Sequence, residues 1–213
     1  MRIVSTNLSK PKEIQWRGKT VITGIFKEPI EGQVTLGEED VEGDSVIDRK
    51  YHGGVDQACY LYSAEHYDTW KEIYPDLDFP FGMFGENLTV DDLDERETVI
   101  GSVYKLGTAK VQISAPRQPC YKLGVKFNDQ GVLKVMINNG FCGTYVRVQE
   151  SGQVKKGDVL ELMESVENGI SIREAFRAIY DESIGDDLKK RIVADQHMPE
   201  NLKVKLVSRH GAY

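Results

Sequence analysis

Ser114-Ala115-Pro116-Arg117-Gln118-Pro119-Cys120 is the stretch around which the rest of the chain can be ordered. It follows Val111-Gln112-Ile113, an apolar–polar alternation that predicts the end of a β-strand. Because proline fixes φ and lacks an amide donor, the two prolines predict that pairing stops here in a rigid turn. Such a turn presents Arg117 and Cys120 beyond the strand, and a nearby cation favours the thiolate form of a cysteine. The alternative is a small buried cysteine, which is the commonest fate of a free thiol.

The length and composition limit the classes of protein to consider. A chain of 213 residues suits one large domain, or one domain with a small appendage. Its 40% hydrophobic content is sufficient for a core and argues against extensive disorder. The formal net charge of -7 argues against a broad nucleic-acid surface, but it leaves room for a local basic pocket that binds phosphate.

The cysteines and the apolar runs indicate the cellular compartment. Cys59, Cys120 and Cys142 form no CxxC pair, and three cysteines are too few for a four-cysteine iron–sulfur cluster or a fully paired disulfide framework. The amino-terminal residues lack the apolar core of a signal peptide, and no apolar run reaches membrane length. We therefore expect a reduced, cytoplasmic protein without a membrane segment.

Residues 1–163 have the pattern of many short strands. Apolar and β-branched runs predict strands at 20–26, 34–36, 58–62, 99–107, 109–115, 144–148 and 157–162, a loop at 81–90 feeding another strand, and helices at 64–73 and 133–139. Ser63 is the expected N-cap of the first helix, Gly140 is the expected C′ glycine of the second, and Ser151-Gly152 is an expected turn. Short strands at this spacing predict a mainly β fold, a β-barrel with a few short helices, whose loops carry the site.

Residues 164–213 have a different, helical character. Ser171-Ile172-Arg173-Glu174 is a capping box that opens a helix to about Tyr180. A second amphipathic helix is predicted at 186–194, and a third begins at Pro199 and ends near Gly211. The sequence thus predicts two domains, 1–163 and 164–213, the second being a small three-helix domain.

Two other segments carry residues that suit a binding site. In Lys50-Tyr51-His52-Gly53-Gly54, the paired glycines allow close approach of the backbone to an anion, with Lys50 and His52 as side-chain contacts. Glu86 and Asn87 lie just before an apolar alternation and can direct polar groups into a cleft. An ordinary hairpin loop for the first segment, and turn chemistry for the second, are the alternatives.

The three segments together resemble those of a known family. Lys50-Tyr51-His52-Gly53-Gly54, Phe84-Gly85-Glu86-Asn87-Leu88, Pro116-Arg117-Gln118-Pro119-Cys120 and Gly157-Asp158 resemble, in this order, the motifs of the MOSC (molybdenum cofactor sulfurase C-terminal) domain. Leu8-Ser9-Lys10-Pro11-Lys12, the 65–70 segment and the helical tail resemble its bacterial YiiM-like branch. The resemblance covers nearly the whole chain.

The resemblance implies a fold, a cofactor and an activity. The implied fold is a MOSC-type β-barrel followed by a three-helix domain, and the implied cofactor is a molybdenum cofactor of the molybdopterin type. Cys120 would ligate molybdenum, and the pocket residues would be Lys50, His52, Gly53, Gly54, Glu86, Asn87 and Arg117. The implied reaction is detoxifying reduction of N-hydroxylated bases such as 6-hydroxylaminopurine to the amine, with His52 or Glu86 as the acid that protonates the leaving oxygen.

The implied reaction needs electrons from elsewhere. The chain has neither a cysteine set for a cluster nor a GxGxxG dinucleotide fingerprint, so we expect a separate electron-donor protein that carries a flavin or an iron–sulfur cluster. The helical tail is a candidate docking surface, and a homodimer is left open. Two rival functions are a non-enzymatic carrier or insertase of the cofactor, and a hydrolase or transferase with Cys120 as nucleophile and His52 as base.

Overall fold

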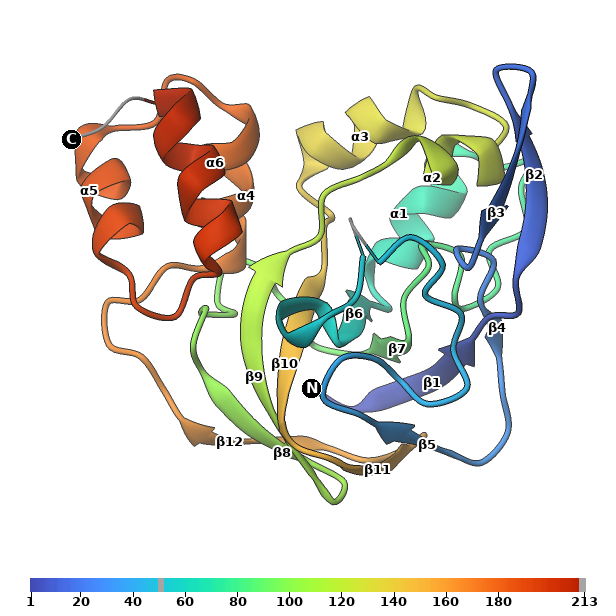
Figure 1. Ribbon diagram of the computed structural model, residues 1–213, viewed down its shortest axis with the longest axis horizontal. Coiled ribbons are helices and arrows are strands. Elements are labelled where there is room, and N and C mark those ends of the chain that lie inside the picture. Colours follow the sequence, from blue (N-terminus) through green and yellow to red (C-terminus); the bar gives the residue numbers. More distant parts are fainter. Residues whose placement is uncertain (50–51, 211–213) are drawn as a thin grey trace.

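The computed structural model describes residues 1–49 and 52–210, and these residues are built around one eight-stranded sheet (Figure 1). Its strands are β1 (Ile3–Leu8), β4 (Glu28–Pro29), β6 (Cys59–Ser63), β7 (Leu88–Val90), β8 (Val103–Leu106), β9 (Ala109–Pro116), β10 (Thr144–Glu150) and β12 (Leu160–Glu164). Their order is β12-β8-β9-β10-β6-β7-β1-β4, and every neighbouring pair is antiparallel except β6 and β7. The mainly β class predicted from the sequence is confirmed.

The expected barrel is not confirmed. Among the described residues, the strand ladders leave β12 and β4 as the two ends of the sheet. One isolated bridge, between Arg2 and Val159, and a backbone hydrogen bond from Ile3 N to Asp158 O (2.9 Å) link the start of β1 to the chain just before β12. Closure of a barrel requires a matched tilt and stagger of all strands, which the spacing of short strands along a sequence does not specify.

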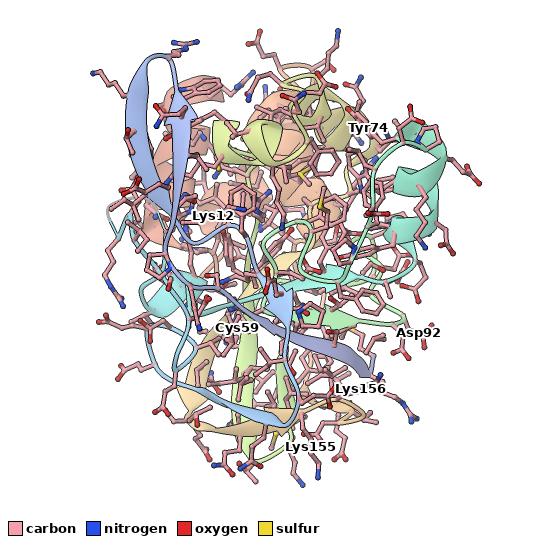
Figure 2. The ribbon with its side chains drawn as sticks, turned by 90° about the vertical axis from the view of Figure 1, so that its right-hand side faces the viewer. Lys12, Cys59, Tyr74, Asp92, Lys155 and Lys156 are labelled. Carbon is pink, nitrogen blue, oxygen red and sulfur yellow. The ribbon has the colours of Figure 1, made fainter. Side chains whose placement is uncertain are left out.

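In the described part of the chain, two short antiparallel pairs of strands are separate from the main sheet. One is the hairpin of β2 (Lys12–Trp16) and β3 (Lys19–Thr23), which stands out as an arm in Figure 2. Both residues of its turn, Arg17 and Gly18, have positive φ, as two-residue turns that match the twist of a hairpin require. The other pair joins β5 (Gln33–Leu36) to β11 (Gly152–Lys155). β5 confirms the strand predicted at 34–36, whereas for β11 the sequence predicted only the turn at Ser151-Gly152.

Within the described residues, three α-helices and a 3₁₀ turn lie between the strands: η1 (Val55–Gln57), α1 (His66–Ile73), α2 (Tyr121–Lys126) and α3 (Val132–Asn139). The predicted end of α3 is confirmed, because Gly140 follows it with φ 68°. The predicted N-cap of α1 is wrong: Ser63 is the last residue of β6, and Glu65 occupies the cap position. The six-residue α2 was missed, since one and a half turns contain too few residues for a helical period to show.

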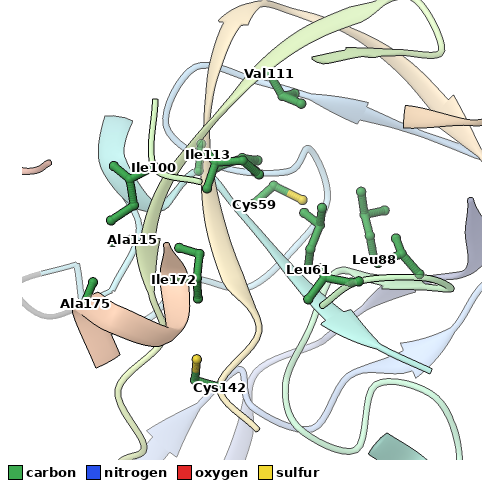
Figure 3. Close-up of a cluster of buried hydrophobic side chains, with 14 of the residues drawn as sticks. Cys59, Leu61, Leu88, Ile100, Val111, Ile113, Ala115, Cys142, Ile172 and Ala175 are labelled. Carbon is green, nitrogen blue, oxygen red and sulfur yellow. The ribbon is translucent and has the colours of Figure 1, made fainter. Parts of the chain in front are cut away.

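The chain after β12 forms the three predicted helices, α4 (Ile172–Tyr180), α5 (Asp186–Ala194) and α6 (Glu200–His210), grouped at one side of the sheet (Figure 1). The capping box that opens α4 is confirmed: Glu174 N donates to Ser171 Oγ (3.1 Å), and Ser171 N donates to Glu174 Oε2 (2.9 Å). Apolar residues of α4 and the sheet share one cluster, which includes Ile172 and Ala175 of α4 and Ile113 of β9, all labelled in Figure 3. The division into two domains at residue 163 stays a prediction.

Two of the three cysteines are part of the hydrophobic core. Cys59 and Cys142 are fully buried in the cluster of Figure 3, and burial raises the pKa of both thiols. Cys120 is partly exposed. Within the described residues, no helix combines the length and the apolar character that crossing a membrane requires.

Candidate functional site

The turn after β9 borders two adjacent cavities that share part of their lining. The inner one, called here the chamber, has a volume of about 100 Å³, and the outer one, called here the cleft, has about 700 Å³. The residues that line the chamber but not the cleft include Lys27, Asp44, Tyr60, Asn87 and Arg117. The residues that line the cleft but not the chamber include Gln118, Tyr121, Pro199, Asn201, Leu202 and Lys205. Both are lined by Asp48, His52, Gly53, Gln57, Cys120, Lys122 and Tyr145, which therefore mark their junction. The cleft volume lies within the roughly 300–1,000 Å³ range of ligand sites.

The predicted proline turn is confirmed and places Cys120 at this junction. β9 ends at Pro116, and α2 begins at Tyr121 with Cys120 at its N-cap position in an extended conformation. The carbonyl of Cys120 accepts the amide of Leu123 (2.9 Å). Of the three cysteines, all of which lie in the described part of the chain, Cys120 is the one that lines these two cavities.

Arg117 is a buried cation without an ionic partner. It is only 5% exposed, and its guanidinium lies 5.3 Å from the centre of the Tyr60 ring and 3.8 Å from Met136 Sδ. No carboxylate among the described residues forms an ion pair with it. A buried charge of this kind is costly unless an opposite charge approaches it, so the chamber is suited to an anion.

His52 and Lys122 add to the polar surface at the junction. Lys122 is 5% exposed, and its Nζ lies 3.5 Å from Oδ2 of Asp48, whose side chain is 40% exposed. Burial, together with the charges of Arg117 and Lys122, lowers the pKa of His52 from 6.5 to about 4. The imidazole is therefore neutral at pH 7 in the ligand-free protein.

The glycine-rich turn around His52 has the predicted backbone form. Gly53 and Gly54 have φ values of 77° and 83°, which side-chain-bearing residues rarely adopt. Gly53 lines both cavities, whereas Gly54 lines neither. Lys50, the remaining residue predicted for this turn, lies outside the described residues.

The structure separates the neighbours Glu86 and Asn87. Glu86 is fully buried and does not line either cavity. Its carboxylate accepts hydrogen bonds from the Gly82 amide (2.8 Å), the Phe84 amide (3.1 Å) and the hydroxyls of Tyr67 and Thr89. These four donors make Glu86 the centre of the 82–89 loop. The geometry does not bring it to Cys120.

Asn87 does reach the chamber, together with an ion pair that the sequence did not reveal. Its Nδ2 donates to Asp44 Oδ2 (2.9 Å), and its Oδ1 accepts the Tyr60 amide (3.2 Å). Lys27 Nζ donates to the same carboxylate of Asp44, and both side chains are buried. Burial alone would raise the pKa of Asp44, but Lys27 and the hydrogen bonds of Asn87 and Ser9 outweigh it and leave the pKa lowered.

Lys126 holds two loops of the chamber together. Its Nζ donates to the carbonyls of Ile25 (3.3 Å) and Gly82 (2.8 Å), so that α2 is tied both to the loop after β3 and to the loop of Glu86. Burial lowers the pKa of this amine to about 8. The two lysines that follow Cys120 in α2 thus have different roles: Lys122 borders the cavities, and Lys126 ties the loops together.

Comparison with known proteins agrees with this geometry. The family model of the MOSC domain matches residues 48–161. The chain is 39% identical to the uncharacterized protein YflK of Bacillus subtilis, over 97% of this chain and 93% of that protein. It is 34% identical to a protein of Gibberella moniliformis named reductase, over 69% of this chain but only 27% of that longer protein. The crystal structure of YiiM from Geobacillus stearothermophilus superposes with a TM-score of 0.82 at 32% identity, covering 99% of each chain. The chain belongs to the MOSC domain family.

Proposed function

We propose that this protein binds a molybdenum cofactor of the molybdopterin type at Cys120 and reduces N-hydroxylated bases, such as 6-hydroxylaminopurine, to the amine in the cytoplasm. The observation that carries the proposal is the position of Cys120, which lines both the chamber and the cleft, near Arg117, which is buried and forms no ion pair among the described residues. Membership of the MOSC family and the similarity to a protein named reductase support it.

The residues present fit such a cofactor. A thiolate is a suitable ligand for a sulfur-rich molybdenum centre, and Cys120 presents its thiol at the junction of chamber and cleft. The guanidinium of Arg117 and the ammonium of Lys122 are suited to the phosphate of the pterin tail. The cleft supplies the space that the small chamber lacks. In this proposal the substrate base binds in the cleft, which α6 lines on one side.

The cofactor, when bound, supplies the two-electron redox chemistry, and the protein supplies positions and protons. The overall reaction, R–NH–OH + 2 e⁻ + 2 H⁺ → R–NH₂ + H₂O, requires a proton at the leaving oxygen. His52 is placed at the junction for that task. A bound anion would raise the pKa of His52 from its low value and let the imidazole hold a proton near pH 7. Glu86, the other acid predicted from the sequence, acts in this proposal by fixing the 82–89 loop.

The electrons come from a separate protein that carries a flavin or an iron–sulfur cluster. The similarity to a longer protein named reductase is compatible with this arrangement, since the matching region is only 27% of that protein. A purified preparation of this chain that turned over with NADH alone would contradict the partner.

The experiment that tests the proposal is molybdenum and pterin analysis of the protein purified from a host that makes the cofactor. We expect molybdenum near one per chain in the wild type, its loss in Cys120→Ala, and its retention in Cys142→Ala, which removes a buried thiol away from the cavities. Absence of molybdenum and pterin from the wild type, even after anaerobic reconstitution, would refute the cofactor and favour a cysteine nucleophile.

The carrier function is the closest rival, since it uses the same cavity. It predicts tight cofactor binding without hydroxylamine reduction when a competent electron donor is present. The cysteine-nucleophile rival predicts metal-free activity and stoichiometric alkylation of Cys120. Within the described residues, no hydrogen bond joins His52 to Cys120, which is the contact that such a nucleophile and base would use.

A further inference from the structure

The hairpin arm of β2 and β3 carries exposed cations that no carboxylate neutralises. Four of them, called here the arm patch, are Lys10 just before the arm, Lys12 in β2, Arg17 in the turn and Lys19 in β3. All four side chains are exposed, and none of them forms an ion pair with another residue in the described part of the chain. Glu13 is the one acidic residue between positions 9 and 20, so this segment has a formal charge of +3 in a chain of net charge -7.

The three helices at the end of the chain, the other candidate docking surface, have a different charge pattern. Residues 164–213 contain eight Lys or Arg and nine Asp or Glu, which nearly balance. Many of these charges pair with each other, as in the ion pairs Arg177–Asp181, Lys189–Asp186, Arg191–Glu174 and Arg209–Glu182. The helical tail therefore presents less unpaired charge to a partner than the arm does.

The arm is held beside the cleft. The ring of Trp16 stacks on that of Tyr121, with centroids 4.7 Å apart and 24° between the planes. Tyr121 lines the cleft and directly follows Cys120 in the chain. Lys19 lies opposite Trp16 in the hairpin, so one cation of the arm patch is next to this ring stack. A protein docked on the arm patch would therefore lie at the border of the cleft, close to Cys120.

The arm also leaves the other side of the cleft free. Figure 1 shows the three-helix group and the arm on opposite sides of α2. Because α6 lines the cleft on its own side, a protein on the arm and a base beside α6 occupy different places.

Charge and reaction together indicate the kind of partner. Exposed, unpaired cations attract a surface of opposite charge and speed its association, and salt weakens this effect. One turnover of the proposed reaction consumes two electrons, which a single flavin can hold. A protein with an acidic face around a flavin matches both the charge of the arm patch and this electron demand.

We propose that the arm patch is the docking surface for an acidic, flavin-carrying electron-donor protein. The inference deepens the proposed function and rests on it for the need for electrons. It assigns the partner to the arm rather than to the helical tail.

The double variant Lys10→Glu/Lys19→Glu tests the arm patch by reversing one charge at each end of it. The matched control is Lys155→Glu/Lys156→Glu, because both of these lysines are exposed and Figure 2 shows them at the lower end of the molecule, away from the arm. Each lysine replaced by glutamate changes the charge by -2, so both double variants have a net charge of -11 instead of -7. A difference between them therefore reports the position of the charge. We expect both to unfold at about the wild-type temperature, since exposed substitutions of this kind have small effects.

The measurement is calorimetric titration of the cofactor-free protein with a purified acidic flavodoxin as the probe, at about 20 mM and about 200 mM salt. We expect the wild type to bind more weakly at the higher salt concentration. At the lower one, the arm variant should bind at least tenfold more weakly than wild type, and the control should stay within about threefold of it. In the molybdenum-loaded protein, the arm variant should raise the KM for reduced flavodoxin and leave kcat unchanged.

Three results would overturn the proposal. The first is failure of the wild type to bind flavodoxin at low salt, and the second is an equal loss of affinity in the arm variant and the control. The third is binding of duplex DNA or anionic lipid vesicles that the arm variant loses while it retains flavodoxin, because the arm patch would then serve another class of partner. These results are independent of the molybdenum analysis: failure of the proposed function is seen as absence of molybdenum from the wild type, whereas failure of this inference is seen in the binding of flavodoxin to the metal-free protein.

Discussion

The neutral, half-buried His52 makes a specific prediction about stability in acid. Its pKa is about 4 in the folded protein and 6.5 in an unfolded chain, because burial and the charges of Arg117 and Lys122 disfavour the imidazolium. The unfolded state therefore binds more protons between these values, and stability falls as the pH falls from 6.5 to 4. A difference of 2.5 units, from 6.5 to about 4, corresponds to at most about 3 kcal/mol of unfolding free energy, of which about 2.5 kcal/mol is lost by about pH 4.5.

The perturbation that isolates this contribution is His52→Gln, which keeps a polar side chain but cannot be protonated. Urea unfolding near pH 7 and near pH 4.5 measures the loss of stability in each protein. We expect the wild type to lose about 2.5 kcal/mol more than His52→Gln over that interval. His197→Gln is the matched control, because His197 lines neither cavity.

Two results would refute this reasoning. The first is the same pH dependence of stability in the wild type and in His52→Gln. The second is an NMR titration that assigns to His52 a pKa near its ordinary value of 6.5. If the reasoning holds, inorganic phosphate at the chamber raises the pKa of His52, and the acid loss becomes smaller when phosphate is added.

Three further substitutions test other parts of the structure. Arg117→Met removes a buried charge that has no ionic partner among the described residues. The free energy of unfolding of the ligand-free protein should therefore stay the same or rise by up to about 3 kcal/mol, and phosphate binding measured by calorimetry should weaken at least tenfold. A less stable variant with normal phosphate binding would contradict this. Glu86→Gln should lower the free energy of unfolding, measured in urea, by about 2–4 kcal/mol and leave the molybdenum content per folded chain unchanged. A variant that is as stable as wild type but inactive would instead assign Glu86 a catalytic role. Ser171→Ala should cost about 1 kcal/mol through loss of the cap on α4, and unchanged unfolding would show that the capping bond contributes nothing.

Features that depend on neighbouring residues were predictable from the sequence. The turn after β9 follows from two prolines within four residues, and the start of α4 follows from Ser171 and Glu174 at capping-box spacing. Gly140 ends α3 for the same local reason, since a residue in the left-handed region favours glycine. In each case the chemistry that fixes the backbone is contained within a few residues of sequence.

Features that depend on distant segments were not predictable. The Lys27–Asp44 ion pair and the Tyr145 wall of the cavities come from segments whose proximity only the folded chain establishes. The different positions of the neighbours Glu86 and Asn87 could not be predicted from the sequence either. Successive side chains point in different directions, and the sequence does not say which of the two faces the chamber. The strand order of the main sheet has the same non-local character, and the barrel expected from the sequence is not confirmed.

The charge of the whole chain and the charge of the cavity have opposite signs, and this difference bears on how the site works. A net charge of -7 repels anions at long range, but at physiological salt that repulsion is screened beyond about 8 Å. Inside the chamber, Asp44 neutralises Lys27, and the half-exposed Asp48 partly neutralises Lys122. His52 is neutral. Arg117 is left without a carboxylate partner among the described residues. The anion is therefore held by desolvated contacts rather than by a broad field. Because a buried cation without a counter-ion weakens the empty fold, its presence is best explained by a ligand that stabilises the protein when it binds.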